Sequence, residues 1–266
     1  METINIVFGG SGTNYPAYIG AYKALYEALI ATGKCEIGEL AGTSGGAIIA
    51  ALIACGYDRP EELERVVTEI LPKDIIDWSW NPFYRWGLIK GKKFRKKLSS
   101  MLREDLPGSS LKYPLKIVVT NVDKEQGEVI DCLTTDMPLS SVVYASACFP
   151  IVFSPVVIKG EKYIDGGLSN NLPVNVVDDN NQNTTYAFRI KQEDIPPKKV
   201  KNVKEYLFRM LNILLKELTR AHLEDLQPFT KIYSAVGHPN GMNLWLTEED
   251  VHDMIEKNYQ QFSTFF

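Results

Sequence analysis

A glycine-flanked serine between two apolar segments limits the folds that this chain can adopt. Residues 42–46 read Gly-Thr-Ser-Gly-Gly; the run at 37–41 predicts a short strand, and residues 47–55 are apolar throughout, which predicts a helix buried on most sides. Small residues two positions either side of a serine relieve crowding in a tight strand-to-helix turn. The pattern indicates a nucleophile elbow with Ser44 at its apex and Gly42 and Gly46 beside it. Taken alone, it also fits a helix-capping serine in a flexible loop.

A second glycine-rich loop follows the first predicted strand, at residues 4–8. It reads Gly-Gly-Ser-Gly over residues 9–12. A serine hydroxyl is a weak nucleophile, so an enzyme that uses one must also stabilise the oxyanion, and glycine lets successive backbone N–H groups converge on an anion. Gly10, Ser11 and Gly12 are therefore candidates for an oxyanion hole. A plain glycine turn is the alternative. A nucleotide phosphate loop is disfavoured because no Gly-Lys-Ser/Thr is present.

The candidate base for the serine is an aspartate. Asp165-Gly166-Gly167 follows a β-prone run at 162–164, although the same pattern also fits a hairpin corner with a solvated aspartate. An α/β-hydrolase esterase with a Ser-Asp-His triad stays open because its chain order is permitted. It is disfavoured because such folds normally place several strands before the elbow, and only about two precede it here. An aspartate of ordinary pKa, about 3.9, is a feeble base, so Asp165 would need a desolvated site or a concerted proton transfer. The histidines that could complete a triad are His222, His238 and His252.

Strands alternate with helices along most of the chain. We expect helices at 16–31, 58–71 and 138–147, and strands at 115–121, 128–133, 151–158 and 185–190. A long helix at 203–226 has leucines at helical spacing, for which core packing is the expected role. This order predicts an α/β fold, a three-layer α/β/α sandwich with a mainly parallel central sheet, in one domain over 1–266 with a C-terminal helical part at 203–266.

Composition narrows the class of protein further. The 266 residues are 45% hydrophobic, enough for a substantial core, and the formal net charge of −4 gives no support to nucleic-acid binding. Four cysteines in apolar stretches, without a Cys-x-x-Cys pair, predict reduced, buried thiols, and no residue pattern demands a cofactor or a metal. The amino terminus lacks a secretory signal pattern and no segment approaches the ~20 apolar residues of a membrane span. We expect a cytoplasmic protein, with peripheral membrane contact or signal-independent export left open.

Residues 75–98, the aromatic–basic segment, differ from the rest of the chain. Aromatic rings cluster before a run of cations, a pairing suited to the boundary between lipid head groups and acyl chains. The alternative is that the rings fill a core and the cations form the solvated face of a helix around Phe94 and Leu98. The rings belong to Trp78, Trp80, Phe83, Tyr84 and Trp86, and the cations are Lys90, Lys92, Lys93, Arg95, Lys96 and Lys97.

Together, these motifs resemble the patatin-like phospholipases. The glycine loop, the elbow within the first 50 residues and Asp165-Gly166-Gly167 occur in the family's order, and the resemblance is strongest over 4–190. Smaller matches are Gly87-Leu88-x-x-Gly91, the segment 114–120, Ala145-Ser146-Ala147 with Pro150 and the segment 153–155, and Asn171-Leu172-Pro173-Val174.

The resemblance implies a lipid acyl hydrolase of the phospholipase A or lysophospholipase type. Ser44 would attack the acyl ester, Asp165 would accept its proton directly, and the amides around Ser11 would hold the oxyanion, with no histidine or cofactor. Asn14 and Tyr15 replace the family's usual cation and glycine, a change expected to weaken oxyanion stabilisation or alter the accepted head group. A family member that binds lipid or protein without turnover is a further alternative.

Overall fold

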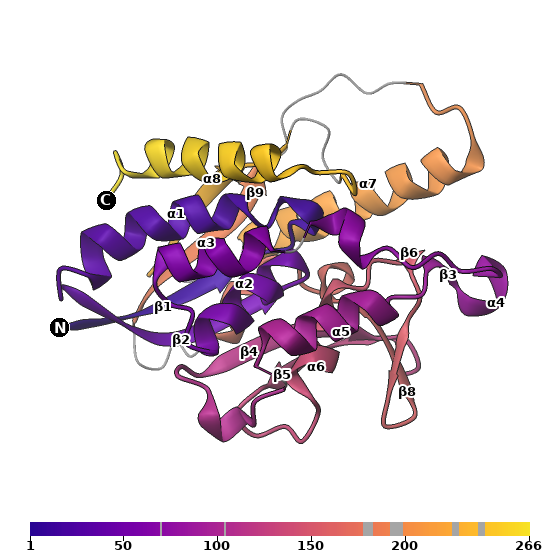
Figure 1. Ribbon diagram of the computed structural model, residues 1–266, viewed down its shortest axis with the longest axis horizontal. Coiled ribbons are helices and arrows are strands. Elements are labelled where there is room, and N and C mark those ends of the chain that lie inside the picture. Colours follow the sequence, from indigo (N-terminus) through magenta and orange to yellow (C-terminus); the bar gives the residue numbers. More distant parts are fainter. Residues whose placement is uncertain (70, 104, 178–182, 192–198, 225–228, 239–242) are drawn as a thin grey trace.

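A mixed sheet flanked by helices forms the centre of the protein in the computed structural model, which describes residues 1–266 except 70, 104, 178–182, 192–198, 225–228 and 239–242 (Figure 1). The order is β10-β9-β1-β2-β4-β8-β7, with β5 also paired to β4. Strands β10, β9, β1, β2 and β4 are mutually parallel, whereas β5 and β8 run antiparallel to β4, and β7 to β8. The predicted α/β class and mainly parallel sheet are confirmed. The strands are β1 (Glu2–Phe8), β2 (Cys35–Thr43), β4 (Leu115–Asn121), β5 (Gln126–Asp131), β7 (Val156–Ile158), β8 (Glu161–Asp165), β9 (Thr184–Lys191) and β10 (Thr230–Val236).

Helices surround this sheet, and a small second sheet joins β3 (Gly87–Ile89) to β6 (Ile151–Phe153). No helix of the described residues combines the length and the apolar character needed to cross a membrane. The helices are α1 (Ala17–Leu25), α2 (Gly45–Ala54), α3 (Pro60–Thr68), α4 (Pro82–Arg85), α5 (Lys92–Met101), α6 (Leu139–Ala147), α7 (Val203–Glu224) and α8 (Glu248–Phe262).

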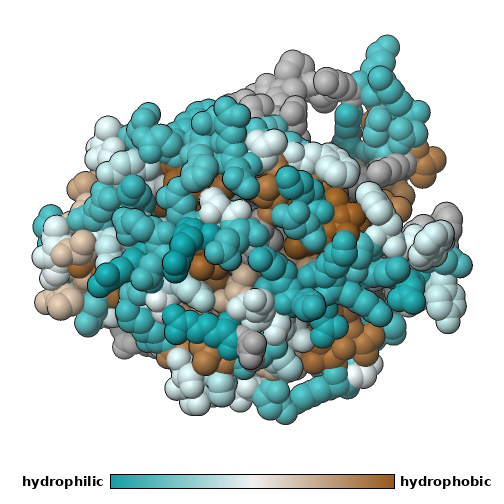
Figure 2. Space-filling view, in the orientation of Figure 1, coloured by the Kyte–Doolittle hydropathy of each residue, from teal (hydrophilic) through white to brown (hydrophobic). Residues whose placement is uncertain are grey.

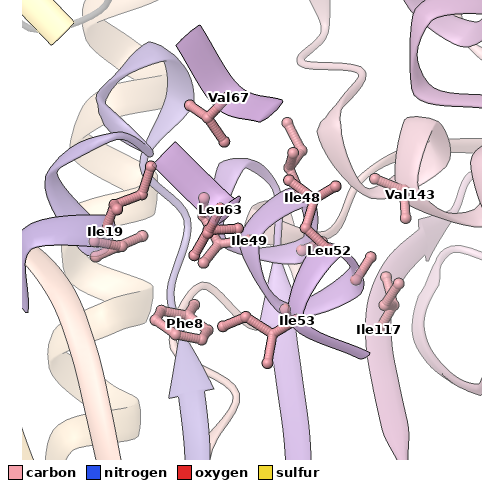
Figure 3. Packing of buried hydrophobic residues seen from close by; sticks show 14 of the residues in the cluster. Phe8, Ile19, Ile48, Ile49, Leu52, Ile53, Leu63, Val67, Ile117 and Val143 are labelled. Atoms are coloured by element: carbon pink, nitrogen blue, oxygen red, sulfur yellow. The ribbon is translucent and has the colours of Figure 1, made fainter. Parts of the chain in front are cut away.

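Helix α2 lies at the heart of the core, as its continuous apolarity predicts. Every one of its residues is buried. Figure 3 shows Ile49 and Ile53 of α2 packed near Phe8 of β1, with Leu63 of α3 close by. Because a core of this density holds its surroundings rigidly, the residue that immediately precedes α2, Ser44, has a fixed foundation.

The carboxyl-terminal region, predicted as a helical part, contains a strand as well as two helices. It contributes β10, an additional parallel strand beside β9, before α8 packs on α1. Thr247 caps α8 reciprocally with Asp250. The predicted strand at 151–158 is also wrong as one element: Ser154 and Pro155 divide it into β6 and β7, because proline has no N–H to donate to a ladder.

The core role predicted for the helix at 203–226 is wrong for most of α7. None of its described side chains is buried; Leu211 and Leu215 are partly buried against the core. Met210 and Leu214, on another side, are exposed. Periodicity alone could not separate a stripe that packs from one that faces solvent.

The close packing of α1 on α8 offers a site at which to test our proposal that residues 1–266 form one domain. Gly20 of α1 lies so near α8 that an added Cβ would overlap the Ile255 carbonyl oxygen. We expect Gly20→Ala to lower the free energy of unfolding by about 1–3 kcal/mol, despite the better helix propensity of alanine. Gln260→Ala, on the exposed face of α8, should change it by less than ~0.5 kcal/mol. Urea unfolding followed by circular dichroism and by tryptophan fluorescence should give coincident transitions; separate transitions would contradict a single domain.

Candidate active site

Ser44 occupies a strained turn between β2 and α2. Its φ of 56° and ψ of −127° are rarely adopted by a residue with a side chain. The surrounding structure holds this conformation: the Ser44 N–H donates to Ser146 Oγ at 2.8 Å, and Ser146 Oγ donates to the Val118 carbonyl at 2.7 Å. Ser146 is fully buried, so these bonds are shielded from water. These hydrogen bonds hold Ser44 in a fixed position at the apex of the turn.

The two predicted elbow glycines are required by close backbone contacts. A Cβ at Gly42 would lie 2.6 Å from the Cα of Ala47, and a Cβ at Gly46 would overlap the carbonyl oxygens of Phe8 and Gly9. Side chains at either position would therefore push α2 away from β1 or distort the turn. The spacing that suggested an elbow has this physical basis.

Asp165 lies directly beside Ser44. Ser44 Oγ donates to Asp165 Oδ2 at 2.6 Å. The sheet order β2-β4-β8 produces this contact, since Ser44 follows the end of β2 and Asp165 ends β8, where it pairs with Val119 of β4. The other carboxylate oxygen, Oδ1, accepts the Gly167 N–H at 2.8 Å. The Asp-Gly-Gly turn thus orients the carboxylate rather than leaving it in solvent.

Burial makes this aspartate an unusually strong base. Ser44 is 7% exposed and Asp165 is 3% exposed. Desolvation raises the pKa of Asp165 to about 7, although the hydrogen bonds from Ser44 and Gly167 act in the opposite direction. The desolvated site that a direct Ser-Asp mechanism needs is present.

The glycine loop lies against the elbow, but its first predicted donor has another partner. A Cβ on Gly10 would lie 3.6 Å from the Ser44 Cβ, so the loop is adjacent to the serine. The Gly10 N–H, however, donates to the Asn171 carbonyl at 2.8 Å. In the described part of the chain, the Ser11 and Gly12 amides have no hydrogen-bond acceptor. Gly12 has a φ of 55°, which explains why glycine is needed there.

Asn14 connects the glycine loop to the carboxyl-terminal region. Its Oδ1 accepts the His238 N–H at 2.8 Å, while the neighbouring Thr13 Oγ1 accepts the Asn243 N–H at 2.8 Å. Asn14 is buried. Sequence reasoning missed this role because β10, which leads to His238, was not predicted. The Asn14 amide therefore anchors the glycine loop to the carboxyl-terminal region.

The histidines of the rival triad have other contacts. His252 Nδ1 lies 3.0 Å from Glu64 Oε1 at the surface, and His238 Nε2 lies 3.7 Å from Asp250 Oδ1. The side chain of His222 is outside the described residues. Within the described ranges, no group of three or more His, Cys, Asp or Glu side chains is placed to hold a metal ion.

Comparison with known proteins adds to this geometry. A sequence model of the family described as patatin-like phospholipase matches residues 6–178. An uncharacterized protein of Acanthamoeba polyphaga mimivirus is 27% identical over 203 residues, which cover 71% of this chain and 67% of the relative. Omega-hydroxyceramide transacylase of Mus musculus is 29% identical over 214 residues, covering 78% of this chain but 34% of the transacylase. The crystal structure of VipD from Legionella pneumophila has a TM-score of 0.64 at 15% identity and covers 99% of this chain and 66% of VipD, a likeness in fold.

The raised pKa of Asp165 predicts a specific pH dependence of stability. Because the folded-state value of about 7 exceeds the ordinary 3.8, the folded protein holds this proton more tightly than the unfolded chain does. The stabilising contribution is complete below about pH 4 and is lost as the pH rises through about 7. Relative to Asp165→Asn, the wild type should lose up to about 4 kcal/mol of unfolding free energy between pH 4 and pH 8, measured by urea unfolding. Parallel curves for the two proteins would contradict the raised pKa.

Proposed function

Because the chain belongs to the patatin-like phospholipase family, we propose that it hydrolyses carboxylic esters of lipids through an acyl-enzyme on Ser44. Lipid acyl hydrolysis is the activity that the family supports. The direct Ser44–Asp165 contact of 2.6 Å is the observation that carries the finer proposal. It supports the proposal because the two side chains lie within hydrogen-bonding reach of each other with no intervening residue, as a nucleophile and its base must.

In the first half of the proposed reaction, Ser44 Oγ attacks the ester carbonyl carbon while its proton passes to Asp165 Oδ2. The tetrahedral intermediate then collapses: the bond from carbon to the alcohol oxygen breaks, and Asp165 returns the proton to that oxygen. In the second half, Asp165 takes a proton from water as the water oxygen attacks the acyl carbon. The bond from that carbon to Ser44 Oγ then breaks, Asp165 returns the proton to Ser44 Oγ, and the fatty acid leaves. A base with a pKa of about 7 suits both halves at neutral pH.

The oxyanion is assigned in our proposal to the Ser11 and Gly12 amides and to the amino-terminal end of α2. The two amides have no acceptor among the described residues and belong to the loop beside Ser44. The positive end of the dipole of α2 also favours negative charge next to Ser44. Gly10 has a different role from the predicted one, because its N–H fastens the loop to Asn171. Its lack of a side chain leaves room for the Asn171 amide.

A phospholipase A or lysophospholipase subtype is our proposal for the substrate, with peripheral membrane contact through the aromatic–basic segment. The alternative in which its rings fill a core disagrees with the described side chains: Trp78, Trp80, Tyr84 and Trp86 are 56–96% exposed, while that of Phe83 lies outside the described residues. The cations, by contrast, do form the solvated face of a helix, as the same alternative predicted. Phe94 and Leu98 of α5 are buried, and the lysines of α5 are mostly exposed. The segment thus presents both rings and cations to solvent.

Substitution of the dyad separates this mechanism from its alternatives. We expect Ser44→Ala and Asp165→Asn each to lower kcat/KM by about 10⁴-fold or more, because nucleophile and base act as a unit. His222→Ala, His238→Ala and His252→Ala should stay within about tenfold of the wild type. Hydrolysis of a nitrophenyl ester and of phospholipids labelled at either acyl chain, with folding checked by circular dichroism, measures both points. The wild-type kcat/KM should rise with pH to a plateau, with its midpoint near pH 7.

The other outcomes select among the rival functions. Loss of activity with one histidine variant, comparable to the loss with Ser44→Ala, would indicate a Ser-Asp-His triad. Lipid binding without product release, unchanged by Ser44→Ala, would indicate a binding protein. Activity that survives both dyad substitutions would overturn the assignment.

A further inference from the structure

Helix α7 lies directly against the catalytic turn. Asn171 Nδ2 donates to Thr219 Oγ1 of α7 at 3.0 Å, and the same Asn171 accepts the Gly10 N–H through its carbonyl. A side chain of α7 also reaches the turn: Leu215 Cδ2 lies 3.5 Å from the position of a Cβ on Gly167, whose amide binds Asp165. One side of α7 is therefore part of the wall around the dyad.

Another side of α7 presents a continuous apolar stripe to solvent. Its members recur at spacings of three and four residues, which places them along one side of the helix. All of them are at least 41% exposed. In Figure 2 some hydrophobic residues reach the surface at the end of the molecule where α7 lies, among hydrophilic ones. The α7 stripe comprises Val203, Tyr206, Met210, Ile213 and Leu214.

The aromatic–basic segment lies at the same end of the molecule. Figure 1 places α7, α4 and β3 at the end toward which β1 points, and the parallel strand β2, which Ser44 follows, ends on the same side of the sheet. The ring of Trp86 is 5.6 Å from Lys162 Nζ on β8, the strand that ends in Asp165. The segment thus lies beside the strand that ends in Asp165, and α7 contacts the turn that follows this strand.

The positive charge of the aromatic–basic segment indicates the kind of surface that it complements. The aromatic–basic segment, residues 75–98, contains seven Lys and Arg against one Asp, a formal charge of +6, in a chain whose formal net charge is −4. A local positive charge in an acidic protein complements an anionic surface, and exposed tryptophan and tyrosine suit the head-group boundary of a bilayer. The α7 stripe suits the acyl layer beneath it.

We propose that the α7 stripe and the aromatic–basic segment form one membrane-docking surface, whose partner is a bilayer that contains anionic lipid. The cations bind head groups, the tryptophans lie at the boundary, and α7 inserts its stripe into the acyl layer beside the dyad. The inference rests on the proposed function for the orientation of the lipid toward Ser44. Binding itself is measured independently of turnover.

The test uses the full chain with Ser44→Ala, so that vesicles are not hydrolysed. Vesicle flotation compares this parent protein with two variants of it. The α7 variant also carries both Ile213→Gln and Leu214→Gln, and the second variant also carries Trp80→Gln. Glutamine keeps helix propensity in α7. The matched control is Phe265→Gln, because Phe265 is 62% exposed and the carboxyl terminus lies at the opposite end of the molecule in Figure 1. Circular dichroism verifies that each variant is folded.

We expect the parent and the Phe265→Gln protein to bind vesicles of phosphatidylcholine with phosphatidylserine equally, and more tightly than vesicles of phosphatidylcholine alone. The α7 variant and Trp80→Gln should each bind the anionic vesicles at least about tenfold more weakly. Equal binding by the α7 variant and the control would overturn the proposal. So would a stable dimer in light scattering that dissociates in the α7 variant, because the stripe would then face a second copy.

An activity arm distinguishes failure of the docking proposal from failure of the proposed function. With Ser44 restored, the α7 variant should hydrolyse a soluble nitrophenyl ester at the wild-type rate and vesicle phospholipid at least about tenfold more slowly. If the α7 variant loses vesicle binding but no Ser44-dependent hydrolysis is found in any protein, the docking proposal stands and the proposed enzymatic function is wrong. If vesicle hydrolysis depends on Ser44 but is unaffected by the α7 changes, the enzymatic function stands and the docking proposal is wrong.

Discussion

The buried hydrogen bond between Ser44 and Asp165 depends on almost every level of the structure. It exists because β4 separates and aligns β2 and β8, so that residues 121 positions apart meet at the end of the sheet. Its character comes from burial, which removes water from the carboxylate and raises the pKa of Asp165 to about 7. A solvent-exposed pair of the same residues would lack this basicity.

Holding this pair has structural costs that its surroundings offset. Ser44 has a strained backbone, and the Ser146 hydroxyl together with the buried helix α2 fixes it in place. The glycine loop is held in a similar manner on both sides: Asn171 binds Gly10, while Asn14 binds the backbone of His238. The carboxyl-terminal region beyond the family match at 6–178 therefore supports the glycine loop.

Local sequence patterns predicted the parts of the fold that depend on local chemistry. The elbow at Ser44 and the buried helix after it follow from glycine spacing and continuous apolarity, and the α/β class follows from the alternation of strands and helices. The direct contact between Ser44 and Asp165 was predicted from the family resemblance, because no local sequence pattern reveals which strands become neighbours. The partner of the Gly10 amide, the strand β10 and the exposed side of α7 were missed for the same reason: each depends on tertiary packing. Apolar periodicity in α7 identified a helix but not which of its sides is covered.

If Asp165 activates Ser44 directly, as proposed, the reactivity of Ser44 toward a covalent label must depend on this carboxylate. The protein is treated with a fluorophosphonate over a range of pH and digested, and the modified peptide is quantified by mass spectrometry. We expect the modification of Ser44 to rise with pH to a plateau, with a midpoint near pH 7, to be lost in Asp165→Asn and to be unchanged in His238→Ala. Labelling of Ser44 that persists at the wild-type rate in Asp165→Asn, or that disappears with a histidine, would contradict it.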